Sequence, residues 1–167
     1  IEPTVGDAPS NPRHYHQYVP IVRGMVRDWD LMEKVWHHLF YSELRVDPAE
    51  HLVVVSEKPL TPAASREMLV GMLFAKFRVP AVHVALGAVL ALYAAGRTTG
   101  ITLDSGHSVT HAVPIYEGHS LPHAVMSAEL GGADVTDHLI ELLTERGVAL
   151  VTDAERDVAE RAKRELA

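Results

Sequence analysis

The chain has no cysteine, few aromatic residues and no long uninterrupted apolar run. Zero cysteines in 167 residues exclude disulfides and thiolate metal sites, which fits a reducing compartment. The longest apolar stretch, residues 79–95, is interrupted by Pro80, His83 and Gly87, so no segment is suited to span a membrane. The start, IEPTVGDAPS, also lacks the pattern of a secretory signal. These absences predict a cytoplasmic protein with no membrane partner.

Positive charge is scarce as well. The chain has 15 lysines and arginines against 22 aspartates and glutamates, a net charge of −7. Proteins that bind nucleic acids usually carry a basic patch that meets the phosphates, so the composition argues against a nucleic-acid partner. The remaining composition, 47% hydrophobic and 22% charged, is typical of a soluble globular domain, and the length suits one domain or two small lobes.

The spacing of apolar residues predicts alternating helices and strands behind a proline-rich start. Residues 1–17 contain Pro3, Pro9 and Pro12 and are expected to form a loose arm. Helices are predicted over 29–44, 61–77, 87–95, 135–146 and 154–166, and strands over 51–56, 80–86, 100–104, 110–116 and 120–130. This order predicts an α/β or α+β class with a mixed sheet.

Some residues are expected to fix the ends and faces of these helices. Asp28 or Asp30 can cap the first helix, and Asp153 can cap the last one. The apolar stripe of the first helix is expected to include Leu31, Val35, Trp36, Leu39 and Phe40.

Four strings, in this order and at this spacing, resemble the actin family. They are WDLMEKVWHHLFYSELRVDPAEH, LYAAGRTTG, THAVPIYEG with LPHA, and LTERGVALVTDAER. The resemblance covers a central segment of actin and lacks the family's first phosphate loop, its adenine loop and its closing helices. It implies an actin-like and ribonuclease-H-like fold, incomplete or rearranged. Residues 18–96 would form part of a first lobe ending in a linker helix and 97–167 part of a second, unless the two merge.

The resemblance also implies a site for ATP with Mg²⁺, of which this chain carries one phosphate loop. That loop is Asp104, Ser105, Gly106, His107 and Ser108, with Asp104 as the expected metal contact. The family has Asp where this chain has His107 and Gly where it has Ser108. Gly132 and Lys163 match residues near the nucleoside, and Glu160 replaces an arginine. The resemblance therefore predicts an eroded nucleotide site.

Hydrolysis is expected to be lost or severely slowed. His111 matches the catalytic histidine of the family, but Gly87 stands where the family has the glutamine that positions the attacking water. Glycine has no side chain that could orient a water molecule. We therefore expect that the chain is not an active ATPase.

Further matches imply a protein partner. They correspond to the cleft in which the family binds its partners: Tyr93, Gly96, Thr98, Glu117 and Gly118. The expected partners are the chain itself, another actin-like chain or an actin-binding protein.

Plainer interpretations of the same residues remain. Residues 104–108 taken alone make an ordinary polar hairpin turn. His107 with His111, or His37 with His38, could suggest a metal pair, but adjacent residues on a helix point in different directions and no third ligand is evident. Surface or packing roles are favoured for these histidines.

Two strands from the first lobe and three from the second leave several arrangements open. They could form a single five-stranded sheet, they could be exchanged between two chains, or another polypeptide could supply further strands.

Three functional hypotheses follow from these observations. The first is an actin-like cytoskeletal protein or pseudo-enzyme that acts by assembly, the second an ATP-binding protein or slow ATPase completed by a second chain, and the third a remnant that merely folds.

Overall fold

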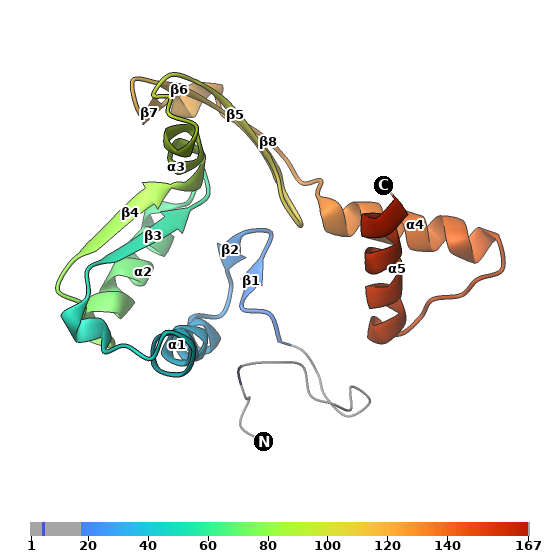
Figure 1. The fold of residues 1–167 in the computed structure, drawn as a ribbon, viewed down its shortest axis with the longest axis horizontal. Helices are drawn as coiled ribbons and strands as arrows, with labels where there is room; N and C mark the ends of the chain where they lie inside the picture. Colours follow the sequence, from blue (N-terminus) through green and yellow to red (C-terminus); the bar gives the residue numbers. More distant parts are fainter. Residues whose placement is uncertain (1–4, 6–17, 167) are drawn as a thin grey trace.

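The computed structural model describes Val5 and residues 18–166, so the expected arm 1–17 lies, apart from Val5, outside the described residues. The chain combines helices and strands, and the mixed α/β class is confirmed (Figure 1). In chain order the elements are β1 (Ile21–Val22), β2 (Met25–Val26), α1 (Trp29–His38), β3 (Val53–Glu57), α2 (Ala63–Ala75), β4 (Val82–Leu86), α3 (Gly87–Ala94), β5 (Gly100–Ser105), β6 (Thr110–Tyr116), β7 (His119–Ser120), β8 (Met126–Ala128), α4 (Gly132–Glu145) and α5 (Asp153–Leu166).

Asp28 caps the N-terminus of helix α1, because its carboxylate accepts a hydrogen bond from the Leu31 amide at 2.9 Å. It continues as a π-helix, Leu39–Leu44, and ends at Arg45, which has a left-handed φ of 55°. Its buried side chains are Met32, Trp36 and Phe40, because a spacing of four residues places them on one face. The prediction that Leu39 belongs to the buried apolar face is therefore wrong, because Leu39 is exposed.

The first sheet consists of the parallel strands β3 and β4, paired from Val53 with Val82 to Glu57 with Leu86. One face packs against α1 and α2 through a cluster of buried residues with three aromatic rings: Met32, Trp36, Phe40, Leu73, Phe77 and Val79. On the other face, Val54 lies open to solvent. This sheet therefore has a core on one side only.

The second sheet is antiparallel, with β6 between β5 on one side and β7 and β8 on the other. The predicted third strand, 120–130, is in fact two short strands, because a 3₁₀ turn at Pro122–Ala124 separates them. Helix α3 covers one face of this sheet, packing Ala88 and Leu92 against Val113 and Ile115.

The two sheets are separate, so the predicted arrangement of all five strands in a single sheet is wrong. The reason lies in the linker. Helix α3 follows β4 without a loop and then packs on β5 and β6, so its body stands between the two sheets.

Helices α4 and α5 form a hairpin beyond the tip of β8 (Figure 1). Thr136 and Ala159 are buried where the two helices meet. The residue that caps α5 is Thr152 rather than the expected Asp153. The Thr152 hydroxyl accepts a hydrogen bond from the Glu155 amide. In return, the Glu155 carboxylate accepts hydrogen bonds from the amides of Val151 and Thr152. Among the residues that the structure describes, no helix combines the length and apolar character needed to cross a bilayer.

Candidate functional site

The phosphate-loop residues predicted from the sequence form the turn between β5 and β6. The Gly106 amide donates to the Val109 carbonyl at 3.0 Å, which closes the turn. Ser105 and Thr110 share a hydrogen bond of 2.9 Å between their hydroxyls, and the Thr110 hydroxyl also lies 2.7 Å from the Leu130 carbonyl oxygen. We call residues 104–108 the DSGHS turn.

The N-terminus of α4 docks onto this turn. The amides of Gly132 and Ala133 donate to the carbonyls of Gly106 and His107, at 2.9 and 2.6 Å. The contact requires glycine at position 131, since a Cβ there would lie 2.5 Å from the Ser108 amide nitrogen. The C=O and N–H groups of a trans peptide point in opposite directions, so the N–H groups of His107 and Ser108 point away from α4.

Lys163 of α5 completes this cluster from the other side of α4. Its ammonium donates to the Gly132 carbonyl at 2.6 Å and to the Thr136 hydroxyl at 2.7 Å. The structure thus places Gly132 against the DSGHS turn and Lys163 against Gly132. Their binding roles remain predictions.

His111 lies behind the turn, on β6, opposite Asp104 of β5. Its side chain is 7% exposed, and among the described residues its Nδ1 atom has no hydrogen-bond partner. Burial lowers the pKa of His111, the positive charge of Lys58 lowers it further, and the charge of Asp104 opposes both. The imidazole is therefore a neutral, buried group with one unused hydrogen-bonding atom.

Two residues of this region were missed by the sequence reasoning, Arg23 and Lys58. The Arg23 guanidinium reaches the carbonyls of Ser108 and Glu129, at 2.9 and 3.1 Å, and the Asp134 carboxylate at 3.4 Å. The Lys58 ammonium donates to the Arg23 carbonyl at 3.0 Å. Gly24 is a general turn signal, but contacts across 85 to 111 residues leave no trace in a local pattern.

Asp134 belongs to the same network. Its carboxylate accepts from the Gly131 amide at 2.8 Å and pairs with Arg23. The hydrogen bond from Gly131 is the main reason that the pKa of Asp134 is lowered, and Arg23 adds to the effect. The carboxylate is thus used to hold α4 in place.

The residues matched to a partner cleft cluster at the opposite end of β5 and β6. Gly96 ends α3 with a φ of 70°, and the Gly118 amide donates to the Thr98 carbonyl at 2.8 Å. Any Cβ on Gly118 would collide with the Tyr93 hydroxyl, and Glu117 adjoins it in the same turn. The structure brings these five residues together, and their partner remains a prediction.

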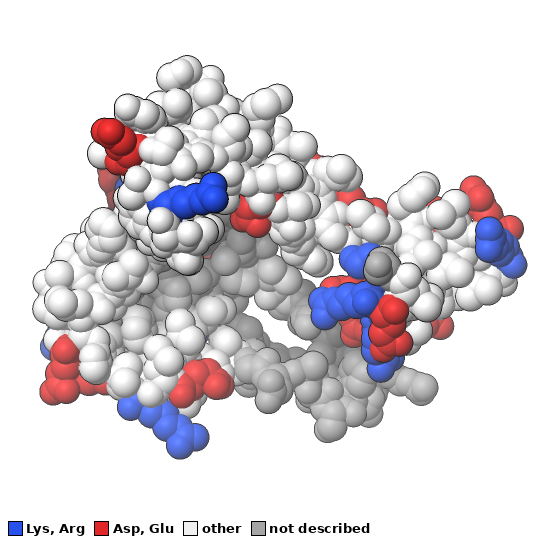
Figure 2. All heavy atoms as spheres, turned by 45° about the horizontal axis from the view of Figure 1, so that its top comes forward, with Lys and Arg blue, Asp and Glu red and all other residues white. Residues whose placement is uncertain are grey.

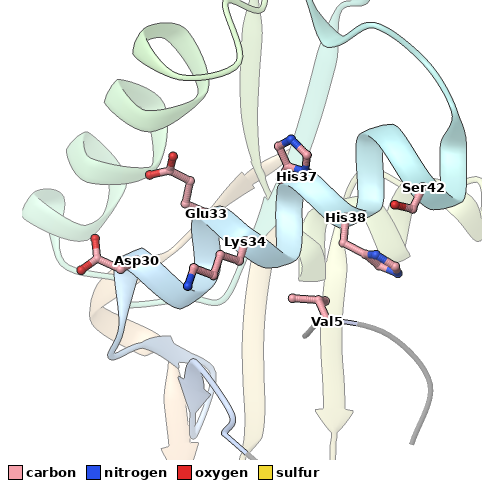
Figure 3. Close-up of a pocket in the computed structure, with 7 residues that line it drawn as sticks. All are labelled: Val5, Asp30, Glu33, Lys34, His37, His38 and Ser42. Atoms are coloured by element: carbon pink, nitrogen blue, oxygen red, sulfur yellow. The ribbon is translucent and has the colours of Figure 1, made fainter. Parts of the chain in front are cut away.

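His37 and His38 do not form a metal pair. They diverge on α1 beside a shallow groove that Lys34 and Val5 also line (Figure 3). The His37 ring packs on Tyr41, with centroids 4.5 Å apart, while His38 Nε2 lies 3.0 Å from a Glu43 carboxylate oxygen. The predicted divergence is confirmed.

The residues around Asp104 do not fit a magnesium ion. Mg²⁺ prefers carboxylate and other oxygen ligands, but the DSGHS turn offers one carboxylate, with His107 beside it. Within the described ranges, no three His, Cys, Asp or Glu residues are grouped so that they could hold a metal ion.

A comparison with protein-family models matches residues 4–165 to the family described as Actin. The match spans nearly the whole chain, and the resemblance drawn from the four strings is confirmed. The chain belongs to the actin family.

Proposed function

We propose that this chain is an actin-like structural protein that acts by assembly with itself or another actin-like chain, and that its nucleotide site is eroded. The observation that carries the proposal is the uncovered face of the second sheet. Ile101, Leu103 and Met126 point away from α3 and are 71%, 73% and 72% exposed. Contiguous exposed apolar patches of this kind commonly mark protein interaction sites.

The distribution of charge supports the same proposal. In Figure 2 charged side chains lie on the helical arm and the lower edge, and the upper part carries a few acidic and basic groups within a largely uncharged surface. The edge of β5 that faces away from β6 pairs with no described strand. An apolar face beside an unpaired strand edge favours association through strand pairing and apolar contact together.

Sedimentation velocity over a range of protein and salt concentrations tests this proposal. Assembly of the wild-type chain should increase with protein concentration, and Leu103→Lys should reduce it. Leu166→Lys is the matched control, because Leu166 is equally apolar and 88% exposed but lies at the end of α5. A wild-type chain that is strictly monomeric under every condition would contradict the proposal.

A second candidate function is nucleotide binding, or slow ATP hydrolysis, in a site completed by a second chain. The buried and unpartnered Nδ1 atom of His111, beside the DSGHS turn, favours it. Phosphate release from ATP that increases with protein concentration and disappears in His111→Ala would support this candidate. No release at high protein concentration would exclude the hydrolytic form.

A further inference from the structure

Helices α1 and α2 pack on the same buried cluster, but their outward faces differ. On α1 the exposed residues are Asp30, Lys34 and His37, as expected for the solvent side of a surface helix. On α2 the exposed residues are mostly apolar, and among them Met68 and Phe74 are 50% and 46% exposed. A helix that is apolar on all sides is usually buried on all sides. The outward face of α2 is therefore uncovered by the part of the chain that the structure describes.

The middle of this outward face is formed by Ala64, Met68, Gly71 and Ala75, and we call these four residues the α2 face. Spacings of four, three and four residues keep them on one side of the helix. Leu73 follows Gly71 by two residues, or about 200° of helical turn. Because Leu73 is 1% exposed and points into the core, the α2 face is turned directly away from the core.

Gly71 has no internal contact that requires a glycine. It lies inside α2, where glycine destabilises a helix relative to alanine. A Cβ at this position would meet no atom within 4 Å among the described residues. The missing side chain therefore leaves an open hollow on the α2 face, one turn from the exposed Met68. Glycine in such a place is expected where another group comes close to the backbone.

A second copy of α2 fits this face when the two helices run antiparallel. The spacing then places Met68 of each copy over Gly71 of the other, and Ala64 of each copy opposite Ala75 of the other. A large side chain on one helix thus meets a hollow on its neighbour, and the two-fold axis repeats the contact. Parallel helices in register would instead set Met68 against Met68 and leave both hollows empty.

The charges beside the α2 face favour the same antiparallel arrangement. Arg66 is paired with a glutamate of β3, and Lys76 with a glutamate of α1. Two exposed charges are left without an ion pair among the described residues: Glu67 in the first half of α2 and Arg78 just beyond its end. An antiparallel copy brings the acidic half of each helix toward the basic end of the other, whereas a parallel copy would place like charges side by side.

We propose that two copies of this chain form a two-fold dimer through the α2 face, with the two helices antiparallel. The proposal deepens the proposed assembly of the chain with itself and rests on that function, but it uses a face separate from the second sheet. A contact between two 13-residue helices falls below the roughly 1,200 Å² of a standard stable interface. The dimer is therefore weak, with a Kd of about 10 μM or higher.

Sedimentation velocity of the Leu103→Lys variant isolates this dimer, because that change removes the assembly proposed for the second sheet. We expect a single step from monomer to dimer that depends on protein concentration. Met68→Lys in this background should raise the Kd about tenfold or more, since it would bury an unpaired charge at the interface. Val158→Lys is the matched control, because Val158 is 48% exposed on α5, and it should leave the Kd unchanged.

Gly71→Gln separates a contact between copies from an effect on the fold. Glutamine favours a helix more than glycine does and has free space around it in the monomer. The melting temperature should therefore rise by roughly 1–3 °C at protein concentrations too low for dimers. The same side chain fills the hollow that Met68 of the other copy needs, so the Kd should rise about tenfold or more.

The direction of the two helices can be tested by cross-linking, because the chain has no cysteine of its own. A disulfide requires two Cα atoms within about 7 Å. Ala64→Cys mixed with Ala75→Cys should therefore form linked pairs under mild oxidation, whereas neither variant should link with itself. Self-linking of Ala64→Cys would mean parallel helices and would overturn the antiparallel dimer.

The failure of this proposal and the failure of the proposed function give different results. If Leu103→Lys is monomeric at every concentration while the wild type still assembles, the α2 dimer is overturned and assembly through the second sheet stands. A wild-type chain that is strictly monomeric would remove both. A dimer of Leu103→Lys that neither Met68→Lys nor Gly71→Gln weakens would lie on another surface, and this result would also overturn the proposal.

Discussion

The two sheets of this molecule are supported in different ways. The parallel pair β3 and β4 packs against two helices through a cluster of six buried side chains, three of them aromatic. The antiparallel sheet packs against the eight-residue helix α3 through four buried side chains, and its other face is open. The first region is thus fixed mainly by its core. The DSGHS turn in the second region is held by polar contacts that come from distant parts of the chain.

The largest expected effect compares the same substitution in the two cores. Leu73→Ala should cost about 3–5 kcal/mol of unfolding free energy, because Leu73 is almost fully buried among aromatic neighbours. Leu92→Ala should cost about 2–3 kcal/mol, since its cluster is smaller and partly open. Urea unfolding followed by circular dichroism measures both, and a loss for Leu92→Ala as large as that for Leu73→Ala would contradict the expected difference between the two cores.

A smaller effect is expected from Arg23→Ala. The substitution removes hydrogen bonds to two carbonyls and ion pairs with Glu129 and Asp134. The Arg23 side chain is 39% exposed, so a loss of about 1 kcal/mol is expected after allowing for solvent screening. Hydrogen exchange should also quicken at the Gly132 and Ala133 amides. Arg27→Ala serves as the control, because Arg27 is exposed in the same segment. Equal stability and exchange rates in the two variants would mean that the side-chain contacts of Arg23 contribute nothing to stability.

The pH dependence of stability should carry the signature of His111. Burial holds the pKa of His111 below its usual value of 6.5 in the folded chain, so the unfolded chain takes up a proton first as the pH falls. This contribution to stability is complete above pH 6.5 and is lost as the pH falls from there toward the lowered pKa. Chemical unfolding at pH 8 and pH 5 should therefore show a smaller acid loss in His111→Asn than in the wild type. Equal losses would place the imidazole in contact with water.

The smallest effect is expected from the ion pair between Glu57 of β3 and Arg66 of α2. Arg66→Gln should cost about 0.2–1 kcal/mol, because the arginine is half exposed although the glutamate is nearly buried. The loss should shrink in 1 M NaCl. Arg156→Gln, which breaks the pair with the exposed Asp137 in the α4–α5 hairpin, should cost less. If Arg156→Gln lowered the unfolding free energy more than Arg66→Gln, the ion pair in the α4–α5 hairpin would be the stronger of the two, contrary to this prediction.

Local patterns in the sequence predict most of the elements, whereas the residues of the candidate site were predicted from the resemblance to actin. The strand 110–116 agrees residue for residue, and Gly132 lies against the DSGHS turn with Lys163 bonded to its carbonyl. The misses have physical causes. Leu39 turns outward because a π-helix changes the periodicity after His38, and the two sheets stay apart because α3 packs between them. Arg23 and Lys58 act across long sequence separations, which no local periodicity encodes.

Arg23 also carries a backbone cost. It adopts a φ of 47° in the two-residue turn with Gly24, a conformation that costs a non-glycine residue roughly 1 kcal/mol or more. Glycine at this position would relieve that cost while deleting the guanidinium, so the two changes nearly cancel in the melting temperature. A library of variants ranked by heat resistance alone would therefore accept Arg23→Gly as neutral. Directed evolution for robustness could in this way discard the contact between the β1–β2 hairpin and the DSGHS turn without any visible penalty.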